Sequence, residues 1–578
     1  MEKIKLIYLI KEPLEYYSYM MLKELANNFK IICISTNKDI TDFCNDNIVV
    51  LSQEEQLWAN LQRELGANCT HVGILNQSLL GPLHDFKIFI NNLIVDSFEI
   101  WSLYQMENYL YGFILMQYKF LSKQILNELI DTGNIHLNDR HLKEMGINWK
   151  SLCHFGKNIN CSTSNYELVV IKKSPFLELE FIGKEKRHQD LQYNDGSDLA
   201  KTAYYIRNKT QYDLKIFYQL LLKKYNIEDI KNLLDLNFIV DEQYCITKKV
   251  KSKVAILIHI YYTELFKTCI NYISIVPKCI DVYITVSSVE HKEKIERLLL
   301  RNKITNASVI LVNNRGRDLS ALLVGCKHIV KQYKYICFVH DKKSHKGEDI
   351  STGRDYFLNL WNNLLLSETY IYNILNILEQ EPSIGFLCPP PPVFGIYFSI
   401  ADNYWTICYK KTYQLLSKLN IQPILHEKKQ PLALGSAFWC KVEAIQDLFD
   451  VDWEYKDFPK EPMALDGTIS HAIERVFPYI AQKNGFLSGW VMNKHTAANL
   501  ITNQGVVLQE SLRKTKKYLG YYDGIPCYLE KLENAMIEQP ERVGVDVEQV
   551  GVKGAVQILR VAIVKFLYKH LYKNRHSK

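Results

Sequence analysis

Short apolar runs of strand length alternate along the chain with amphipathic stretches of helix length. One apolar run spans residues 3–10, a helical pattern follows at 16–29, and a second apolar run spans 31–35. The same order returns at residues 253–260, 265–275 and 282–286. A β-α-β order predicts parallel strands, and its return about 250 residues later fits a duplicated domain better than a short solenoid repeat. The pattern therefore predicts an α/β protein with two mostly parallel, Rossmann-like sheets in tandem.

The second half carries three clusters of polar residues, two of which directly follow apolar runs. Residues 309–312 precede the sequence Asn-Arg-Gly-Arg-Asp at 314–318, and residues 335–339 precede His-Asp-Lys-Lys-Ser at 340–344. The third cluster consists of Asp466, Gly467 and Thr468, followed by His471, Glu474 and Arg475. Ligands of open α/β sheets bind beyond the carboxyl ends of strands, so the clusters predict an enzyme that acts on an anionic ligand. The first half has no counterpart of the cluster at 314–318, which predicts weaker or altered ligand chemistry there.

The cluster at 314–318 fits a strand-to-helix turn that binds a ligand. Gly316 permits a positive φ or a close approach of the backbone, and Arg317 can hold a phosphate or carboxylate in a bidentate fork. Asp318 can accept a hydrogen bond from a base or a ribose hydroxyl, or it can cap a helix that starts at Leu319. A well-capped turn with a structural Arg–Asp pair would contain the same residues, so both interpretations stay open.

The cluster at 340–344 is the sharper signal. Lys342 and Lys343 are badly placed for packing after a buried strand, but they can neutralise a diphosphate. His340 or Asp341 can bind a divalent cation, because hard cations take oxygen ligands and imidazole suits several transition metals. An ordinary solvated loop is the alternative, and the position of the lysines favours a function.

Asp466 in the third cluster lies at the start of a predicted helix. A carboxylate there is stabilised by the helix dipole and can serve as a cap. A general base for an acceptor hydroxyl must also be a carboxylate or a histidine that is held rigidly, and the two roles are compatible. His471 and Arg475 lie one helical turn apart and share a face. His259 and His495 are lone histidines near strand ends and indicate no function by themselves.

Composition and charge exclude several classes of protein. A hydrophobic share of 47% in 578 residues is ample for buried cores and excludes a disordered chain. The net charge of +7 does not require nucleic acid as a partner. The 14 cysteines show no C-x-x-C pair, the start of the chain lacks a signal-peptide pattern, and no apolar stretch is long enough for a bilayer. We therefore expect a reduced, cytoplasmic protein that binds no nucleic acid.

The patterns divide the chain into four predicted segments. Residues 1–175 form a degenerate N-terminal domain, 176–250 a linker with bridging helices, 251–505 the catalytic domain, and 506–578 a helical tail. The last helix pattern, residues 555–572, has an apolar stripe and a basic remainder, which fits in-plane binding to an anionic membrane surface. Docking on the protein itself is the alternative, and the uncompensated positive charge at the chain end favours the membrane.

Together with residues 258–262 and 435–439, the three clusters resemble the rhamnan synthesis F family of bacterial polysaccharide glycosyltransferases. The resemblance extends over about residues 253–495, and the segment 75–82 is similar to the N-terminal region of the family. It implies the GT-A fold and a nucleotide-sugar donor. The implied nucleotide and donor contacts are His259, Asn314, Gly316, Arg317, Asp318 and Arg475. The resemblance also implies that Lys342 and Lys343 contact the diphosphate, that Gly435 borders the sugar, and that Asp466 is the base.

The chain departs from the family pattern at the metal motif. His340-Asp341-Lys342 stands where an Asp-x-Asp motif is usual. Either His340 or Asp341 binds Mg²⁺ or Mn²⁺ together with His495, or the lysines replace the metal. Both arrangements supply positive charge where the leaving diphosphate develops negative charge. The sequence leaves both open.

The resemblance implies transfer of L-rhamnose from a dTDP-linked donor to a lipid-linked surface glycan, at the inner face of the plasma membrane. One displacement assisted by an aspartate base implies inversion at the anomeric carbon. A non-catalytic glycan-binding or scaffold subunit of a polysaccharide assembly complex is one alternative. A phosphotransferase acting on sugar phosphates is another, and the lack of a Walker loop in the sequence counts against its ATPase version.

Overall fold

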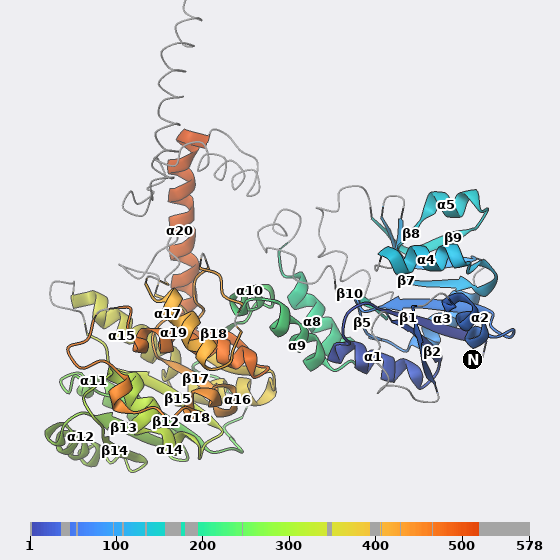
Figure 1. Ribbon diagram of the computed structural model, residues 1–578. Helices are drawn as coiled ribbons and strands as arrows, with labels where there is room; N and C mark the ends of the chain where they lie inside the picture. The colour runs from blue at the N-terminus through green and yellow to red at the C-terminus, as the bar shows by residue number, and fades with distance from the viewer. Residues whose placement is uncertain are drawn as a thin grey trace, which may run out of the picture. The chain divides into compact units, whose positions relative to one another are not determined.

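The computed structural model describes the chain between residues 3 and 519 with several gaps (Figure 1). The described ranges are 3–35, 47–53, 56–95, 98–106, 109–132, 136–155, 175–179, 195–245, 247–343, 350–392, 405, 407–422, 424–427, 429–464 and 466–519. Contacts divide the chain into two compact units, residues 1–185 with 197–501 and residues 186–196 with 502–578. Both large sheets lie in the first unit.

The first large sheet is mixed and has the strand order β3-β2-β1-β4-β7-β6-β9, with β8 paired to β7. Strands β3, β2, β1 and β4 are mutually parallel, and β7 runs antiparallel to β4 and β6. The strands are β1 (Ile4–Ile10), β2 (Lys30–Ser35), β3 (Ile48–Ser52), β4 (His71–Asn76), β6 (Ile100–Met106), β7 (Tyr109–Gln117), β8 (His136–Asn138) and β9 (Trp149–Phe155). Its helices are α1 (Tyr16–Ala26), α2 (Leu57–Leu65), α3 (Phe86–Val95), α4 (Lys123–Thr132) and α5 (Asp139–Glu144). The short strands β5 (Leu79–Leu80) and β10 (Leu177–Glu178) form a separate antiparallel pair.

The second large sheet has the order β11-β18-β16-β17-β15-β12-β13-β14. Its strands are β11 (Asn237–Val240), β12 (Val254–His259), β13 (Asp281–Val286), β14 (Ala307–Leu311), β15 (Tyr335–His340), β16 (Ile384–Cys388), β17 (Phe438–Lys441) and β18 (Leu487–Asn493). The longer helices of this half are α8 (Asp198–Lys209), α9 (Leu214–Lys224), α10 (Ile227–Leu233), α11 (Phe266–Ser274), α12 (Val289–Arg301), α15 (Ile350–Leu364), α16 (Glu368–Gln380), α17 (Tyr409–Lys418), α19 (Ile469–Lys483) and α20 (Lys494–Leu519). The short helices include α13 (Arg317–Ser320), α14 (Lys327–Val330) and α18 (Gln446–Asp450).

The two sheets repeat one order of strand pairing. In each, three parallel strands lead to the central strand β4 or β15, and an antiparallel strand, β7 or β17, lies beside it. The next strand, β6 or β16, then pairs in parallel with β9 or β18. The second sheet adds β11 beside β18. The predicted α/β class with mostly parallel strands is therefore confirmed for both sheets.

Buried strands and one helix fix the end of β15. Every residue of β12 is buried, as expected for a central parallel strand with both faces covered. The indole of Trp361 in α15 is fully buried and donates to the carbonyl oxygen of His340 at 3.1 Å. Trp439 in β17 donates in the same way to Leu364 O at 3.0 Å. Both bonds attach α15 to the sheet, and the first does so at His340, where the second polar cluster begins.

The bridging helices α9 and α10 pack on the core of the second sheet. The Gln482 side chain in α19 donates to the carbonyl oxygens of Leu222 at 2.6 Å and Tyr225 at 2.7 Å. Glu228 belongs to α10, one of these packed helices. Its Oε2 is buried with no hydrogen-bond partner among the described residues. Burial raises the pKa of Glu228 to about 8, and the positive charge of Lys231 only partly offsets that effect. Glu228 is thus a protonated acid at neutral pH.

We expect the Glu228→Gln variant to gain stability relative to the wild type as the pH rises from about 5 to about 9. The native state binds the Glu228 proton more tightly than the unfolded chain does, so this contribution is present below the ordinary pKa and is lost as the pH rises through about 8. Glutamine is neutral throughout, and the backbone N–H of residue 228 keeps its bond to Asn226 Oδ1. Urea unfolding at a series of pH values measures the difference. A difference that stays constant with pH would show that Glu228 ionises normally in the folded protein.

Within the described residues, no helix combines the length and the apolar character needed to cross a bilayer. The predicted basic helix at 555–572 lies outside the described residues, so its binding to a membrane stays a prediction. The cysteines that the structure describes are free thiols, and most of them are buried.

Candidate active site

Two of the predicted site residues lie side by side at the carboxyl ends of neighbouring strands. His259 ends β12 and His340 ends β15, and the two are paired in the register of these parallel strands. The backbone N–H of Asp341 continues the pairing by donating to His259 O at 3.1 Å. The first-strand tip and the second polar cluster therefore meet, as expected for strand ends on one edge of a sheet.

The carboxylate of Asp341 holds the backbone that follows β12. Its Oδ2 accepts hydrogen bonds from the backbone N–H groups of Tyr261 at 3.0 Å and Tyr262 at 2.5 Å. Asp341 is only 6% exposed, and burial raises its pKa to about 6 although the two N–H donors act in the opposite direction. The residue predicted as a cation ligand thus has an oxygen committed to the loop after the first strand.

The protonated nitrogen of His259 can be assigned from its partners. Its Nδ1 lies 2.9 Å from Thr285 Oγ1, and that hydroxyl donates its one hydrogen to Ile258 O at 3.2 Å. Thr285 must therefore accept, so Nδ1 of His259 carries the hydrogen and Nε2 carries a lone pair. Burial lowers the pKa of His259 to about 4, which keeps the ring neutral at neutral pH.

The first polar cluster forms a turn that is fixed by a distant loop. Gly316 has φ +78° and is the N-cap of α13, which begins at Arg317. The predicted cap at Asp318 is therefore wrong, because the helix starts two residues earlier than expected and Asp318 lies inside its first turn. Arg315 donates from Nε to Phe458 O at 2.6 Å and from a terminal nitrogen to Lys456 O at 2.8 Å.

Arg317 and Asn314 are the accessible members of this turn. The Arg317 side chain is 36% exposed, and its Nε lies 3.8 Å from Glu461 Oε1. The ion pair seen for Arg317 is thus with Glu461, whereas the structural interpretation of the sequence expected an Arg–Asp pair within the turn. Asn314 is exposed. Both side chains can therefore reach a bound ligand without disturbing the core.

Asp318 connects the first two clusters. Its Oδ2 lies 4.0 Å from Nε2 of His340, and its carboxylate also has a hydrogen bond with the Ser436 side chain. Burial acts to raise the pKa of Asp318, but interactions with His340 and His259 and the bond to Ser436 outweigh it and leave the pKa below its ordinary value. Asp318 thus connects the turn at 314–318 with His340.

The two lysines of the second cluster differ in their surroundings. Nζ of Lys342 lies 5.3 Å from the ring centroid of Tyr356, a buried residue of α15. Lys343 is exposed, and its Nζ pairs with Glu264 Oε1 at 3.0 Å. Lys342 is accordingly the better placed of the two to contact a diphosphate, because the charge of Lys343 is already balanced by Glu264.

The third cluster caps α19 without using Asp466. The N-cap is Thr468, whose backbone N–H and hydroxyl lie 3.3 Å and 2.8 Å from Nδ1 of His471. The cap role predicted for Asp466 is therefore wrong, since the helix begins later in the chain than expected. Asp466 is half-buried, and its Oδ1 accepts from Cys408 Sγ at 3.0 Å.

Gly435 is held against both α15 and α19. Its backbone N–H donates to Glu474 Oε1 at 2.6 Å, and its φ is +84°. A Cβ atom at this position would lie 2.5 Å from the hydroxyl oxygen of Tyr356. The glycine therefore allows a close approach of the backbone beside the site. Arg475, which is buried, donates to His471 O at 2.8 Å and stiffens the same turn of α19.

Packing of α13 against α19 brings the first and third clusters together. Burial lowers the pKa of His471, with Glu474 and Asp466 acting against that effect and Arg475 and Arg317 adding to it.

The side chains of Ser436, Glu474 and Cys408 make contacts at this site that the sequence analysis did not assign. Ser436 follows the predicted Gly435, and Glu474 lies one turn after His471. This nearness to predicted site residues is the feature of the sequence that could have identified them.

The cation ligands predicted from the sequence, His340 or Asp341 together with His495, stay a prediction. His495 lies on α20, is exposed, and has Nε2 3.1 Å from Asn499 Nδ2. Among the described residues, no three His, Cys, Asp or Glu side chains form a group that could hold a metal ion. One atom nevertheless fits a cation, because Asp318 Oδ2 is buried and has no hydrogen-bond partner in the described part of the chain.

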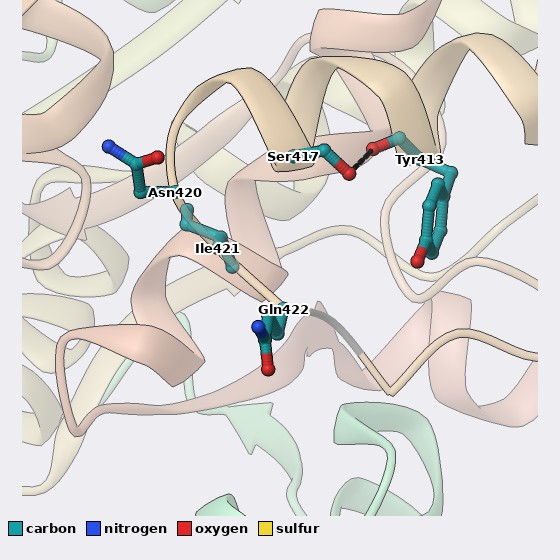
Figure 2. A pocket seen from close by; sticks show the side chains of 5 residues that line it. All are labelled: Tyr413, Ser417, Asn420, Ile421 and Gln422. Carbon is teal, nitrogen blue, oxygen red and sulfur yellow. Dashed lines mark hydrogen bonds between the residues drawn. The ribbon is translucent and has the colours of Figure 1, made fainter.

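A separate hollow of about 430 Å³ lies at the C-terminal end of α17 (Figure 2). It is lined by Tyr413, Ser417, Asn420, Ile421 and Gln422. Figure 2 shows the Ser417 side chain donating to the backbone oxygen of Tyr413, at 3.0 Å. None of the site residues lines this hollow, and Cys408, which contacts Asp466, is at the opposite end of α17.

Comparisons with known proteins give one extended match and several partial ones. A segment of 163 residues is 26% identical to the uncharacterized protein WxcX of Xanthomonas campestris pv. campestris strain B100, and it covers 28% of this chain and 22% of that protein. A second strain of that organism gives the same identity and coverage. The chain thus spans about a fifth of the length of these relatives.

Two solved structures are similar to parts of this chain. One is the mannosyltransferase PcManGT from Pyrobaculum calidifontis in complex with GDP-Man and Mn²⁺. It is 11% identical with a TM-score of 0.25, and the match covers 64% of this chain and 91% of the PcManGT chain. The glycosyltransferase GlyE of Streptococcus pneumoniae TIGR4 is 12% identical with a TM-score of 0.20, covering 61% and 89%. TM-scores this low carry no argument about this chain.

The model of the family described as rhamnan synthesis protein F matches residues 134–486, which is more than half of the 578 residues. The chain therefore belongs to the rhamnan synthesis protein F family.

Proposed function

We propose that the protein is a glycosyltransferase of polysaccharide synthesis that takes its sugar from a nucleotide-linked donor. Membership of the rhamnan synthesis family supports a role in making a polysaccharide. The observation that carries the activity is the convergence of three distant polar clusters on one edge of the second sheet. His259 and His340 lie at adjacent strand ends, Asp318 lies 4.0 Å from His340, and α13 packs against α19, whose His471 interacts electrostatically with Asp466 and Arg317.

The residues divide the chemistry of transfer among them. Asp466 accepts the proton of the acceptor hydroxyl, which then attacks the anomeric carbon while the bond to the diphosphate breaks. Lys342 stabilises the negative charge on the leaving diphosphate. His259, Asn314, Arg317 and Asp318 bind the nucleotide part of the donor. Gly435 lets the sugar approach the backbone, and Glu474 holds Gly435 in place.

The finer assignment is L-rhamnose from dTDP-rhamnose, moved with inversion onto a lipid-linked glycan. The family description supports rhamnose as the sugar. The repeated order of strand pairing supports two GT-A-like domains in tandem, of which the first binds acceptor glycan or orients the second. The basic amphipathic pattern at 555–572 supports peripheral binding at the inner face of the plasma membrane.

The Lys342→Ala variant tests the donor site. We expect it to lower sugar transfer at least about tenfold, because one charge that stabilises the leaving group is lost. The assay follows release of nucleotide from a panel of nucleotide sugars with a lipid-linked acceptor, after thermal stabilisation has identified the donor that binds. Lys292→Ala is the matched control, because Lys292 pairs with Glu296 on the surface of α12. A wild-type protein that no nucleotide sugar stabilises and that transfers none would instead be a non-catalytic scaffold.

A further inference from the structure

The side chain of Asp341 joins the ends of two neighbouring strands. It follows β15 directly, and its Oδ2 accepts from the backbone N–H groups of Tyr261 at 3.0 Å and Tyr262 at 2.5 Å. These two residues are the second and third after His259, which pairs in register with His340. Two consecutive donors on one oxygen fix the direction in which the chain leaves the strand. We call this arrangement a loop clamp.

The first sheet contains a loop clamp at the matching position. Gln77 follows β4 directly, and its Oε1 accepts from the backbone N–H groups of Lys11 at 2.8 Å and Glu12 at 3.0 Å. In the register of β1 and β4, Leu9 pairs with Asn76. Lys11 and Glu12 are the second and third residues after Leu9, so the spacing on both strands equals that in the second sheet.

The clamp is present in the first sheet although the charged groups around it are not. Leu9 and Asn76 stand at the positions of the two strand-end histidines of the second sheet. The two lysines that follow Asp341 are matched by a serine and by Leu79, whose side chain is fully buried. A feature that both sheets share, with and without the charged groups, belongs to the framework of the sheet. Because the amide of Gln77 is neutral, the clamp needs an acceptor oxygen and no negative charge.

The loop after β12 borders the residues proposed to bind the donor. Tyr261 is 44% exposed, and the ring centroid of Tyr262 lies 5.5 Å from Nζ of Lys343. Tyr262 also interacts electrostatically with Arg317. We infer that Asp341 is a positioning residue, which holds this loop ready for the nucleotide part of the donor through its hydrogen bonds and not through its charge. The identity of the ligand rests on the proposed transferase function. A loop that is ordered beforehand removes part of the entropic cost of binding.

Two substitutions of Asp341 separate hydrogen bonding from charge. Asparagine keeps an acceptor oxygen and loses the charge, whereas alanine loses both. A cation ligand, which the sequence predicts for His340 or Asp341, needs the charge and would be impaired in both variants. A clamp is impaired by alanine alone. Gln77→Ala is the matched control, because it removes the same clamp from the sheet that lacks the charged groups.

Hydrogen exchange of the backbone amides in the full-length protein measures the clamp directly. We expect the amides of Tyr261 and Tyr262 to be protected in the wild type and in Asp341→Asn. In Asp341→Ala they should exchange at least about tenfold faster, because they lose their acceptor. In Gln77→Ala the faster exchange should appear at the clamp of the first sheet instead.

Equilibrium dialysis with dTDP, UDP and GDP measures the positioning role. Asp341→Asn should bind the nucleotide that the wild type binds within about threefold of the wild-type affinity, since a neutral acceptor weakens each hydrogen bond without removing it. Asp341→Ala should bind it at least about tenfold more weakly, because the loop must then be ordered on binding. Gln77→Ala should bind as the wild type does. If thermal denaturation shows that Asp341→Ala does not fold, Asp341→Asn decides: it must keep both amide protection and nucleotide affinity.

Three results would overturn the positioning role. They are a loss of nucleotide binding in folded Asp341→Asn, wild-type binding by Asp341→Ala, and a wild type that binds none of the three nucleotides. Transfer assays on the same samples separate this role from the proposed function. Sugar transfer at the wild-type rate by Asp341→Ala would reject the positioning role alone. Nucleotide binding in the expected order, in a protein that turns over no donor, would reject the transferase alone.

Discussion

Replacing Asp466 with asparagine should reduce sugar transfer by about 10²–10⁴-fold while leaving the fold and donor binding close to wild type. An amide has nearly the same shape as a carboxylate, and its oxygen can still accept the hydrogen bond from Cys408 Sγ. It cannot take a proton from the acceptor hydroxyl, so the loss is confined to the chemical step. We expect the start of α19 to keep its structure in this variant, because Thr468 and His471 cap the helix without Asp466.

Initial rates of nucleotide release, with donor and acceptor both saturating, measure this effect as kcat. Asp450→Asn is the matched control, because Asp450 is an exposed carboxylate that pairs with Lys331 at 3.0 Å. That variant should transfer sugar at the wild-type rate. If Asp466→Asn transfers as fast as the wild type, the general base is another group. A variant that binds donor normally and transfers slowly would support the assignment, since loss of folding would reduce both.

The strand ends of the second half could be predicted because buried parallel strands leave a plain signature. The apolar run at 335–339 is interrupted by His340 at the residue where the strand ends, and the run at 253–260 reaches His259 in the same way. Parallel pairing then brings the two histidines together with no further information. The proximity of His259 to the cluster at 340–344 was therefore readable from the order of apolar and polar residues.

The partners of those residues could not be predicted, because they come from segments far away in the sequence. Asp318 bonds to Ser436, Gly435 to Glu474, and Arg315 to the carbonyl oxygen of Phe458. Each contact depends on how loops and α19 pack on the sheet, and no local pattern records that packing. The two caps predicted at Asp318 and Asp466 were wrong for the same reason, because the ends of helices depend on such contacts.

The surroundings of Asp341 and Asp318 show this limit most clearly. Asp341 follows His340 directly, and the sequence predicts that either of them binds a cation together with His495. In the structure, Oδ2 of Asp341 accepts from the backbone of Tyr261 and Tyr262, and α13 places Asp318 near His340. A carboxylate that fixes a loop and one that faces a histidine look the same in sequence. Only the backbone donors around each one distinguish them.

The Gly316→Ala variant should lose about 2–5 kcal/mol of stability and bind donor weakly. Gly316 has φ +78°, a conformation that costs an L-residue about 1–2 kcal/mol. Its new Cβ would also lie 2.4 Å from Cβ of Phe458, which is buried in the core. Relieving that overlap costs about 1–3 kcal/mol more. Because Phe458 O holds the Arg315 side chain, any movement displaces the turn that carries Arg317 and Asp318.

Gly485→Ala separates the two costs of that substitution. Gly485 has φ +81°, so alanine there bears the same backbone strain, but no atom lies within 4 Å of its added Cβ. We expect this control to lose only about 1–2 kcal/mol and to keep donor binding. Denaturant unfolding of both variants, with donor affinity measured by thermal stabilisation, gives the comparison. Equal losses would mean that Phe458 yields without cost and that the turn at Gly316 is not clamped against it. A larger loss at Gly316, joined to weaker donor binding, would show that this contact positions the nucleotide-binding residues.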